Sequence, residues 1–185
     1  MMYAGWIISG PWLLWVLYWF FSALNAQRME QAEPPASRLL HLALFILSFV
    51  LVAWPGLAGW PLVPDRLLAL ILGVCIEVSG LGLTVWARVY LGQYWSGAVG
   101  IKVGHKLIFG GPYALVRHPI YTGMVLAFLG TILSADRMVG LLALALFTFA
   151  YVRKILIEEK WLVRQFNEEY TGYQRNVWAF IPFIW

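Results

Sequence analysis

The sequence has few charged residues. Asp, Glu, Lys and Arg make up 12% of its 185 residues, while hydrophobic residues make up 62%. Soluble domains carry about 25% charged residues, so this deficit argues against a soluble domain and favours an integral membrane protein. The pI near 9.3 comes without a basic patch in the sequence, which argues against nucleic-acid binding. The basic residues are better explained as signals of membrane topology.

Cysteine is nearly absent, and no repeat or low-complexity segment is present. The single cysteine, Cys75, lies in an apolar run and excludes an internal disulfide. The three histidines, His41, His105 and His118, do not have the spacing of metal ligands, and Cys75 is remote from them in the expected topology. We therefore expect no metal site.

Long apolar runs dominate the rest of the chain. A helix needs about 20 residues to cross a hydrocarbon core of about 30 Å. We expect about five transmembrane helices, over residues 3–24, 39–60, 67–87, 119–135 and 138–157. The last helix can continue past Glu158 and Glu159 to about Phe166. No Lys or Arg precedes the first run, so we expect a retained helix rather than a signal peptide. Ser37 is the expected N-cap of the second helix.

The distribution of Lys and Arg predicts the orientation. With the N-terminus outside, the cytoplasmic segments are residues 25–38, 88–118 and 153–185, and they hold all but Arg66 and Arg137 of the thirteen Lys and Arg residues. Cytoplasmic loops are enriched in these residues. The loop between the third and fourth helices and the C-terminal segment should therefore both face the cytoplasm.

The stretch His105–Tyr121, HKLIFGGPYALVRHPIY, is the most promising part of that loop. Gly110-Gly111-Pro112 allows a sharp turn and a close approach of the backbone to a ligand. Tyr113 and Tyr121 offer flat faces for an adenine ring or a sulfonium cation. His118 precedes Pro119, the expected first residue of a helix whose free N–H groups suit an anion. The alternative is an interfacial loop whose Arg117 and His118 only contact lipid headgroups.

Two carboxylates on predicted helices, Glu158 and Glu77, are further candidates for a functional role. Lys154 and Glu158 are four residues apart and share a helical face. Glu158 is either part of a solvated helix end or a partner for ribose hydroxyls or an ammonium group. Glu77 lies in the middle of the third span, where a charge is costly, so it is either neutral and bonded to a neighbouring helix or a functional proton carrier.

Taken together, the loop and the Glu158 helix resemble the isoprenylcysteine carboxyl methyltransferase family and its prokaryotic relatives, over roughly residues 88–185. The segments that carry the resemblance are His105-Lys106-Leu107-Ile108, Gly111-Pro112-Tyr113, Arg117-His118-Pro119-Ile120-Tyr121-Thr122-Gly123, Glu158-Glu159, Phe166-Asn167-Glu168-Glu169-Tyr170 and Tyr173. The family merges at its edges with phospholipid N-methyltransferases and with membrane sterol-type reductases.

The resemblance implies a membrane-embedded methyltransferase that uses S-adenosyl-L-methionine and releases S-adenosyl-L-homocysteine. In that case residues 1–185 form one domain, with three membrane helices in 1–87 and the cofactor-binding, catalytic part in 88–185. The positions that match the family's cofactor site are His105, Lys106, Leu107, Ile108, Tyr113, His118, Pro119, Ile120, Tyr121 and Glu158.

The resemblance also indicates where the methyl acceptor binds. In eukaryotic members a basic residue one helical turn before the glutamate is linked to the substrate carboxylate. Lys154 stands there in this chain, with Arg153 beside it, where an arginine is expected; lysine supplies charge without a bidentate fork. Arg153 and Lys154 are therefore the catalytic candidates. A glutamine that contacts the cofactor in eukaryotic members has no counterpart near Ala98.

The expected reaction is methyl transfer to a lipophilic acceptor that enters from the bilayer, such as the carboxylate of a prenylated cysteine or a similar lipid-like molecule. Membrane lipids are the other expected partners, and the expected location is a prokaryotic inner membrane with the active site on the cytoplasmic side. The alternatives are a phospholipid N-methyltransferase, a nicotinamide-dependent reductase and a non-enzymatic membrane scaffold.

Overall fold

The computed structural model describes the chain except residues 1, 25, 27–28, 55–59, 97–99 and 103–105. The main elements are α1 (Met2–Ala23), β1 (Met29–Ala32), α2 (Pro35–Ala53), α3 (Arg66–Leu91), β2 (Gly100–Lys102), α4 (Pro119–Ala135) and α5 (Val139–Asn176). Two short 3-10 helices, η2 (Gly92–Tyr94) and η3 (Gly111–Ala114), lie between α3 and α4. The predicted all-α membrane architecture is confirmed, apart from an additional pair of short strands.

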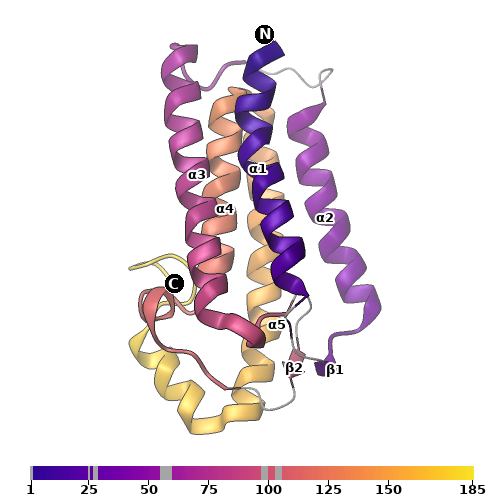
Figure 1. The fold of residues 1–185 in the computed structure, drawn as a ribbon, viewed down its shortest axis with the longest axis vertical. Coiled ribbons are helices and arrows are strands. Elements are labelled where there is room, and N and C mark those ends of the chain that lie inside the picture. Colours follow the sequence, from indigo (N-terminus) through magenta and orange to yellow (C-terminus); the bar gives the residue numbers. More distant parts are fainter. Residues whose placement is uncertain (1, 25, 27–28, 55–59, 97–99, 103–105) are drawn as a thin grey trace.

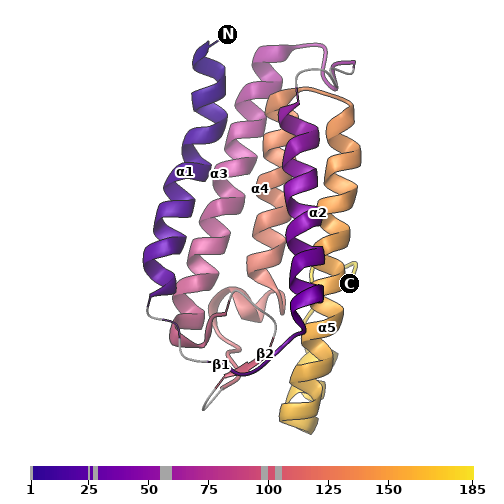
Figure 2. The ribbon, with the colours of Figure 1, turned by 90° about the vertical axis from the view of Figure 1, so that its right-hand side faces the viewer.

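The helices run alternately up and down along the long axis of the molecule (Figure 1). Among the described residues, α1, α2, α3 and α5 are long and apolar enough to cross a membrane, and α4 is a shorter apolar helix of 17 residues. The N-terminus lies at one end of the bundle, and the loop between α3 and α4, the two strands and the last part of α5 lie at the other (Figures 1 and 2). This opposite placement of the two ends agrees with a count of five crossings.

Helices α3 and α4 approach each other closely. A Cβ atom added at Gly80 would lie 2.4 Å from the backbone nitrogen of Ala127, and one at Gly130 would lie 2.3 Å from the backbone nitrogen of Glu77. Small residues permit such contacts between helices, which are stabilised by van der Waals packing in a membrane. Nearby, Glu77 is fully buried and accepts a 3.0 Å hydrogen bond from the Thr131 hydroxyl. The interpretation of Glu77 as a carboxyl bonded to a neighbouring helix agrees with this contact.

Several boundaries differ from the expected ones. Helix α2 begins at Pro35, with Pro34 at the N-cap and no side-chain cap, so the prediction of Ser37 as the N-cap is wrong. Proline suits the first turn because its missing N–H needs no partner there. Helix α4 matches its predicted bounds, from Pro119 to Ala135, and Asp136 ends it in the left-handed conformation at φ 53°.

Helix α5 continues beyond the predicted membrane span, past Glu158 and Glu159, and its first part ends near Phe166 as expected. Residues 139–166, the part before a kink at Asn167, correspond to a length of about 42 Å at ~1.5 Å per residue, longer than a bilayer core of about 30 Å. At Asn167 the backbone leaves helical geometry, with φ 47° and ψ −116°. The remaining part of the helix therefore turns back toward the bundle (Figure 1).

The two strands connect distant parts of the chain. β1 pairs with β2 in an antiparallel arrangement, with Gln31 opposite Ile101 and Ala32 opposite Gly100. Both strands lie in segments that were predicted to be loops between helices. Their pairing attaches the connection between α1 and α2 to the loop between α3 and α4, at the end of the bundle where the site lies (Figure 2).

Candidate functional site

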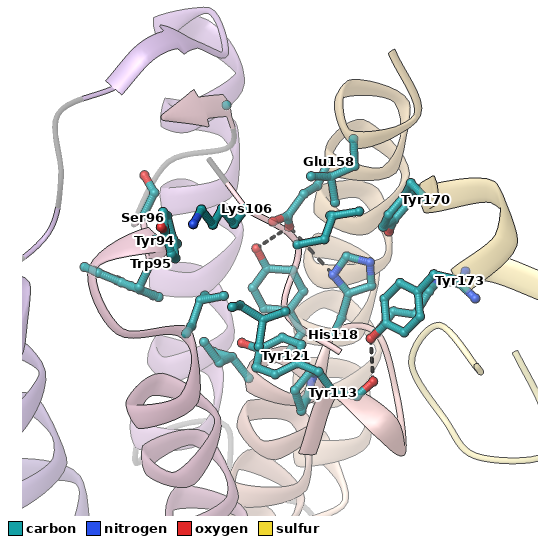
Figure 3. A pocket seen from close by; sticks show the side chains of 18 residues that line it. Tyr94, Trp95, Ser96, Lys106, Tyr113, His118, Tyr121, Glu158, Tyr170 and Tyr173 are labelled. Carbon is teal, nitrogen blue, oxygen red and sulfur yellow. Dashed lines mark hydrogen bonds and ion pairs between the residues drawn. The ribbon is translucent and has the colours of Figure 1, made fainter. Parts of the chain in front are cut away.

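A pocket with an empty volume of about 770 Å³, open to solvent, lies at this end of the bundle. Its wall combines the end of α3, the loop from η2 through η3 to α4, and the second half of α5 (Figure 3). The lining residues are Leu91, Tyr94, Trp95, Ser96, Gly100, Lys106, Leu107, Ile108, Tyr113, Arg117, His118, Pro119, Ile120, Tyr121, Glu158, Leu162, Tyr170 and Tyr173.

The glycine turn shapes one wall of the pocket. Gly111 has φ +59°, and a Cβ atom at this position would lie 2.5 Å from the ring of Tyr90. Only glycine adopts this conformation and accepts this approach without strain. The turn places Tyr113 in a buried position, where its backbone carbonyl accepts a hydrogen bond from the hydroxyl of Tyr173. Burial, with the nearby carboxylate of Glu158, raises the pKa of the Tyr113 phenol well above its ordinary value, so this hydroxyl stays neutral.

A stacked pair forms the next part of the wall. The rings of His118 and Tyr121 are nearly parallel, 5° apart in orientation, with centroids 5.5 Å apart. His118 is the N-cap residue of α4, and Tyr121 follows within the first turn of that helix. The Tyr121 hydroxyl donates a hydrogen bond of 2.7 Å to Oε2 of Glu158, and Nδ1 of His118 lies 3.7 Å from the same oxygen. Figure 3 shows these three side chains together at the pocket.

Glu159, the residue after Glu158, shares His118 with it, since its Oε1 lies 3.4 Å from Nε2 of His118. Its other partners are different. Its Oε1 lies 2.8 Å from Nε and 2.6 Å from a terminal nitrogen of Arg117, while Oε2 accepts a 3.0 Å hydrogen bond from Gln174. The hydroxyl of Tyr170 donates to Oε1 at 3.3 Å. The Glu159 side chain is 13% exposed, against 30% for Glu158. Glu159 therefore ties the loop to α5 behind the pocket, and Glu158 is the carboxylate that faces the pocket.

The C-terminal segment supports the loop from behind. The backbone N–H groups of Arg117 and His118 donate to the carbonyls of Trp178 and Ala179 at 2.8 and 3.0 Å. The Thr122 hydroxyl donates to the carbonyl of Phe180 at 2.6 Å. From its sequence alone, this aromatic segment is too short to span a bilayer and indicates only an interfacial tail. The large exposure of Phe183, 86%, still suits a membrane interface, while Ala179 and Phe180 are buried.

The predicted site residues divide into three groups. The pocket is lined by Lys106, Leu107, Ile108, Tyr113, His118, Pro119, Ile120, Tyr121 and Glu158. His105, also predicted to bind the cofactor, lies outside the described residues. Arg153 and Lys154 do not line the pocket. The guanidinium of Arg153 contacts Ser37 and His41 on α2, whereas Nζ of Lys154 lies 5.2 Å from the ring centroid of Tyr121.

Sequence reasoning missed several lining residues. Tyr94, Trp95 and Ser96 follow α3 in a segment that has no distinctive pattern. Tyr170 and Tyr173 belong to the segments that carry the family resemblance, and that signal could have placed them in the site. They reach the pocket because the backbone bends at Asn167.

Comparison with known proteins agrees with this geometry. Residues 68–169 match the phospholipid methyltransferase family, so the chain belongs to that family. Within this class it is a relative of the isoprenylcysteine carboxyl methyltransferases, as the resemblance predicted. A solved structure of the eukaryotic intramembrane Ras methyltransferase ICMT aligns with a TM-score of 0.56 and 25% identity, covering 84% of this chain and 55% of that one. The chain is therefore a multi-pass membrane protein.

Two kinds of enzyme stand among its relatives. The protein-S-isoprenylcysteine O-methyltransferase of Schizosaccharomyces pombe is 36% identical over 101 residues, which are 53% of this chain and 43% of that protein. The methanethiol S-methyltransferase of Pseudomonas deceptionensis is 41% identical over 71 residues, 38% of this chain and 26% of that protein. The matches thus span less than half the length of each of these relatives.

Proposed function

We propose that this protein transfers a methyl group from S-adenosyl-L-methionine to a lipophilic acceptor. The observation that carries the proposal is the convergence of Tyr113, His118, Tyr121 and Glu158 on one pocket, within a chain of the phospholipid methyltransferase family. These residues come from the loop, α4 and α5, and no pair of segments alone would create the site.

The side chains of the pocket suit such a cofactor. Glu158 offers a carboxylate to ribose hydroxyls or to the ammonium group of the methionine part. The rings of Tyr113 and Tyr121 offer faces that attract a sulfonium cation. Lys106, which also lines the pocket, offers a cation to the cofactor carboxylate. When bound, S-adenosyl-L-methionine supplies a methyl group on a positively charged sulfur.

The protein's contribution to such a transfer is positioning and exclusion of water. The acceptor oxygen or sulfur forms its bond to the methyl carbon while the carbon–sulfur bond of the donor breaks. An acceptor that is already a carboxylate or a thiolate needs no general base. Holding the two reactants in line then supplies most of the acceleration. The buried rings around Tyr121 limit the access of water to this position.

We propose an anionic acceptor, with the carboxylate of a prenylated cysteine as the first candidate. The cation of Lys154, at 5.2 Å from the Tyr121 ring, lies behind the pocket wall, where it favours an anion. A thiolate is the second candidate, because the methanethiol S-methyltransferase shares 41% identity over its matched segment. An amine acceptor must lose a proton first, which this cation opposes, so we place phospholipid N-methylation third.

We also propose that the pocket faces the cytoplasm of a prokaryotic cell. Eleven of the thirteen Lys and Arg residues lie in segments that this orientation places inside, namely residues 25–38, 88–118 and 153–185. Such a bias is the strongest sequence signal of orientation. The cofactor would then enter from the cytoplasm and the acceptor from the bilayer.

The test is calorimetric binding of S-adenosyl-L-homocysteine to the full chain in lipid nanodiscs. We expect saturable binding that weakens at least about tenfold in Glu158→Ala and in His118→Ala, since each removes a polar group at the pocket. The proposal would be contradicted if the wild type bound no S-adenosyl-L-homocysteine. It would also be contradicted if both variants kept the wild-type affinity.

The acceptor is tested with a radiolabelled methyl donor and three separate acceptors. They are N-acetyl-S-farnesyl-cysteine, decanethiol and phosphatidylethanolamine. We expect label in the farnesyl-cysteine ester first. Label in decanethiol alone would replace the carboxylate by a thiolate, and label in the lipid amine alone would overturn the preference for an anionic acceptor.

A further inference from the structure

A buried polar cluster lies outside the pocket, between the start of α2 and the middle of α5. Glu33 and His41 are 2% and 5% exposed, and Nδ1 of His41 lies 3.6 Å from Oε2 of Glu33. Nε2 of His41 is 2.6 Å from a terminal nitrogen of Arg153, and the same nitrogen lies 3.0 Å from the Ser37 hydroxyl. Glu33, Ser37 and His41 precede residues 68–169, the part of the chain that matches the family.

Donor and acceptor chemistry assigns the roles within this cluster. A guanidinium has N–H donors and no acceptor. Nε2 of His41 must therefore accept from Arg153, which leaves the ring proton of a neutral His41 on Nδ1, toward Glu33. The neutral imidazole thus accepts a hydrogen bond from Arg153, while its Nδ1 lies 3.6 Å from Oε2 of Glu33, too far for a hydrogen bond. The opposite charges of Glu33 and Arg153 lie on either side of the ring.

The cluster has a consequence for the next residue of α5. Successive residues of a helix point about 100° apart, so the rotation that turns Arg153 toward α2 also determines where Lys154 points. Nζ of Lys154 lies 5.2 Å from the ring centroid of Tyr121, whose hydroxyl donates to Glu158. Lys154 therefore stands one helical turn before Glu158 and beside the stacked wall of the pocket.

We propose that Glu33, Ser37 and His41 are positioning residues for Lys154. They hold Arg153 against α2 and so fix the rotation of α5 about its axis. This rotation turns Lys154, rather than Arg153, toward Tyr121, where we place the acceptor. This inference rests on the proposed methyl transfer and deepens it. It makes Lys154 the cation that meets an anionic acceptor, and it gives the first half of the chain a part in acceptor recognition.

If the cluster only stabilised the fold, its variants would lose stability and keep the wild-type KM for the acceptor. Removing one partner from a buried charged cluster leaves the others uncompensated and lowers stability. A misplacement of about 1 Å at a reacting group, in contrast, costs up to about 100-fold in rate. If the cluster positions Lys154, removal of His41 should therefore raise the KM for the acceptor in the folded protein and leave cofactor binding unchanged.

The first test compares His41→Phe, His41→Gln and Ser48→Ala in nanodiscs. Glutamine restores an acceptor for Arg153 and a donor for Glu33, while phenylalanine provides neither. Ser48 is the control, because it is buried on the same helix and donates to the Leu44 carbonyl of that helix. With N-acetyl-S-farnesyl-cysteine, we expect His41→Phe to raise the KM for the acceptor about tenfold, with glutamine restoring most of it and Ser48→Ala within about twofold.

A second comparison asks whether His41 acts through Lys154. If it does, His41→Phe should have little further effect on the acceptor KM in the Lys154→Met background, because the two changes are coupled. Independent effects in the double variant would overturn the proposal. An equal loss of S-adenosyl-L-homocysteine affinity in His41→Phe would also overturn it, by indicating a general distortion.

A third measurement does not depend on the identity of the acceptor. The chain has only four lysines, Lys102, Lys106, Lys154 and Lys160, so carbon-13 labelling of lysine gives a simple spectrum. Lys154, assigned by its loss in Lys154→Met, should show a ring-current shift from Tyr121. We expect that shift to disappear in His41→Phe, to persist in His41→Gln, and to decrease in Ser37→Ala.

Ser37→Ala removes one hydroxyl and serves where His41→Phe does not fold. A Lys154 signal that is unchanged in every folded variant of this cluster would overturn the positioning role. These outcomes are separate from a failure of the proposed function, which appears as a wild-type chain that binds no S-adenosyl-L-homocysteine.

Discussion

Tyr121 and Glu158 come from different helices and meet through a hydrogen bond of 2.7 Å, from the tyrosine hydroxyl to Oε2 of the carboxylate. The bond joins the first turn of α4 to α5 at the surface of the pocket. It orients the carboxylate and occupies one of its oxygens. Glu158 therefore presents a fixed acceptor to a ligand rather than a mobile charge.

Removing only the Tyr121 hydroxyl should weaken ligand binding without changing the shape of the pocket wall. For Tyr121→Phe we expect the dissociation constant of S-adenosyl-L-homocysteine to rise about 3- to 10-fold, as one hydrogen bond to a charged group is lost. Tyr151→Phe is the matched control, since the Tyr151 ring packs on Tyr121 at a centroid distance of 5.0 Å and keeps that contact. Calorimetry on both variants checks this, and equal affinities would contradict it.

The same substitution should have different effects at the adjacent carboxylates Glu158 and Glu159, reducing ligand affinity at the first and stability at the second. Glu159→Gln leaves Arg117 without its charged partner in a partly buried place, so we expect a loss of about 1.5–3 kcal/mol of stability. That corresponds to a melting temperature lowered by about 3–10 °C. Glu158→Gln should change the melting temperature little and weaken S-adenosyl-L-homocysteine binding.

Differential scanning fluorimetry and calorimetry separate these two effects. The wild type and both variants are measured in the same nanodisc preparation, with and without ligand. A Glu159→Gln variant as stable as the wild type would show that the contacts behind the pocket are dispensable. A Glu158→Gln variant with full affinity would remove Glu158 from the binding site.

The glycine turn provides a test with a neighbouring control. Gly111→Ala places a Cβ atom at φ +59° and 2.5 Å from the Tyr90 ring, and both the left-handed conformation and the clash are unfavourable by about 1–3 kcal/mol or more. We expect at least about a tenfold loss of S-adenosyl-L-homocysteine affinity, because that strain displaces Tyr113.

Gly110→Ala is the control, as the nearest atom to its added Cβ is 3.8 Å away and its φ of −89° suits any residue. We expect this variant to bind like the wild type. Similar losses in both variants would show that general loop flexibility, and not the Gly111 conformation, determines binding.

Packing between α3 and α4 should determine stability rather than binding. Gly130→Ala would place a Cβ atom 2.5 Å from the Gly73 carbonyl oxygen and force the helices apart. Overpacking of this kind costs about 1–3 kcal/mol. Gly82→Ala on α3 meets nothing within 4 Å and should be neutral or slightly stabilising. Thermal unfolding in nanodiscs checks the pair, and equal melting temperatures would contradict the packing argument.

The orientation is testable with engineered cysteines in a Cys75→Ser background. Met138 and Lys160 are exposed and lie toward opposite ends of the first part of α5. With the N-terminus outside, a membrane-impermeant maleimide should label Met138→Cys in intact cells. It should label Lys160→Cys only after lysis, and the reverse pattern would invert the topology.

Local signals explain how much of this structure the sequence could predict. Pro119 and the polar turn after Ala135 bound α4 correctly, since proline at a first turn and a charged turn are both short-range features. The gathering of the tyrosines, His118 and Glu158 was predicted through the family resemblance, because composition alone left a simple interfacial loop open.

The missed features depend on contacts between distant residues. Nothing near β1 indicates that it pairs with β2, some seventy residues away. The direction of the Arg153 side chain depends on His41, so the local sequence could not separate Arg153 from Lys154. The continuation of α5 to about Phe166 was predicted, but the helical segment after the kink at Asn167 was not, because it is polar and depends on contacts with the loop between α3 and α4.

The pairing of β1 with β2 limits how the chain can be recombined. Strand β1 and the Glu33–His41 pair belong to the first half, yet they contact β2 and Arg153 in the second half. A chimera that joins residues 88–185 to the helices of another relative would lose these partners. A functional chimera would therefore need residues 29–41 of this chain together with its second half. The site thus depends on two separate segments of the sequence.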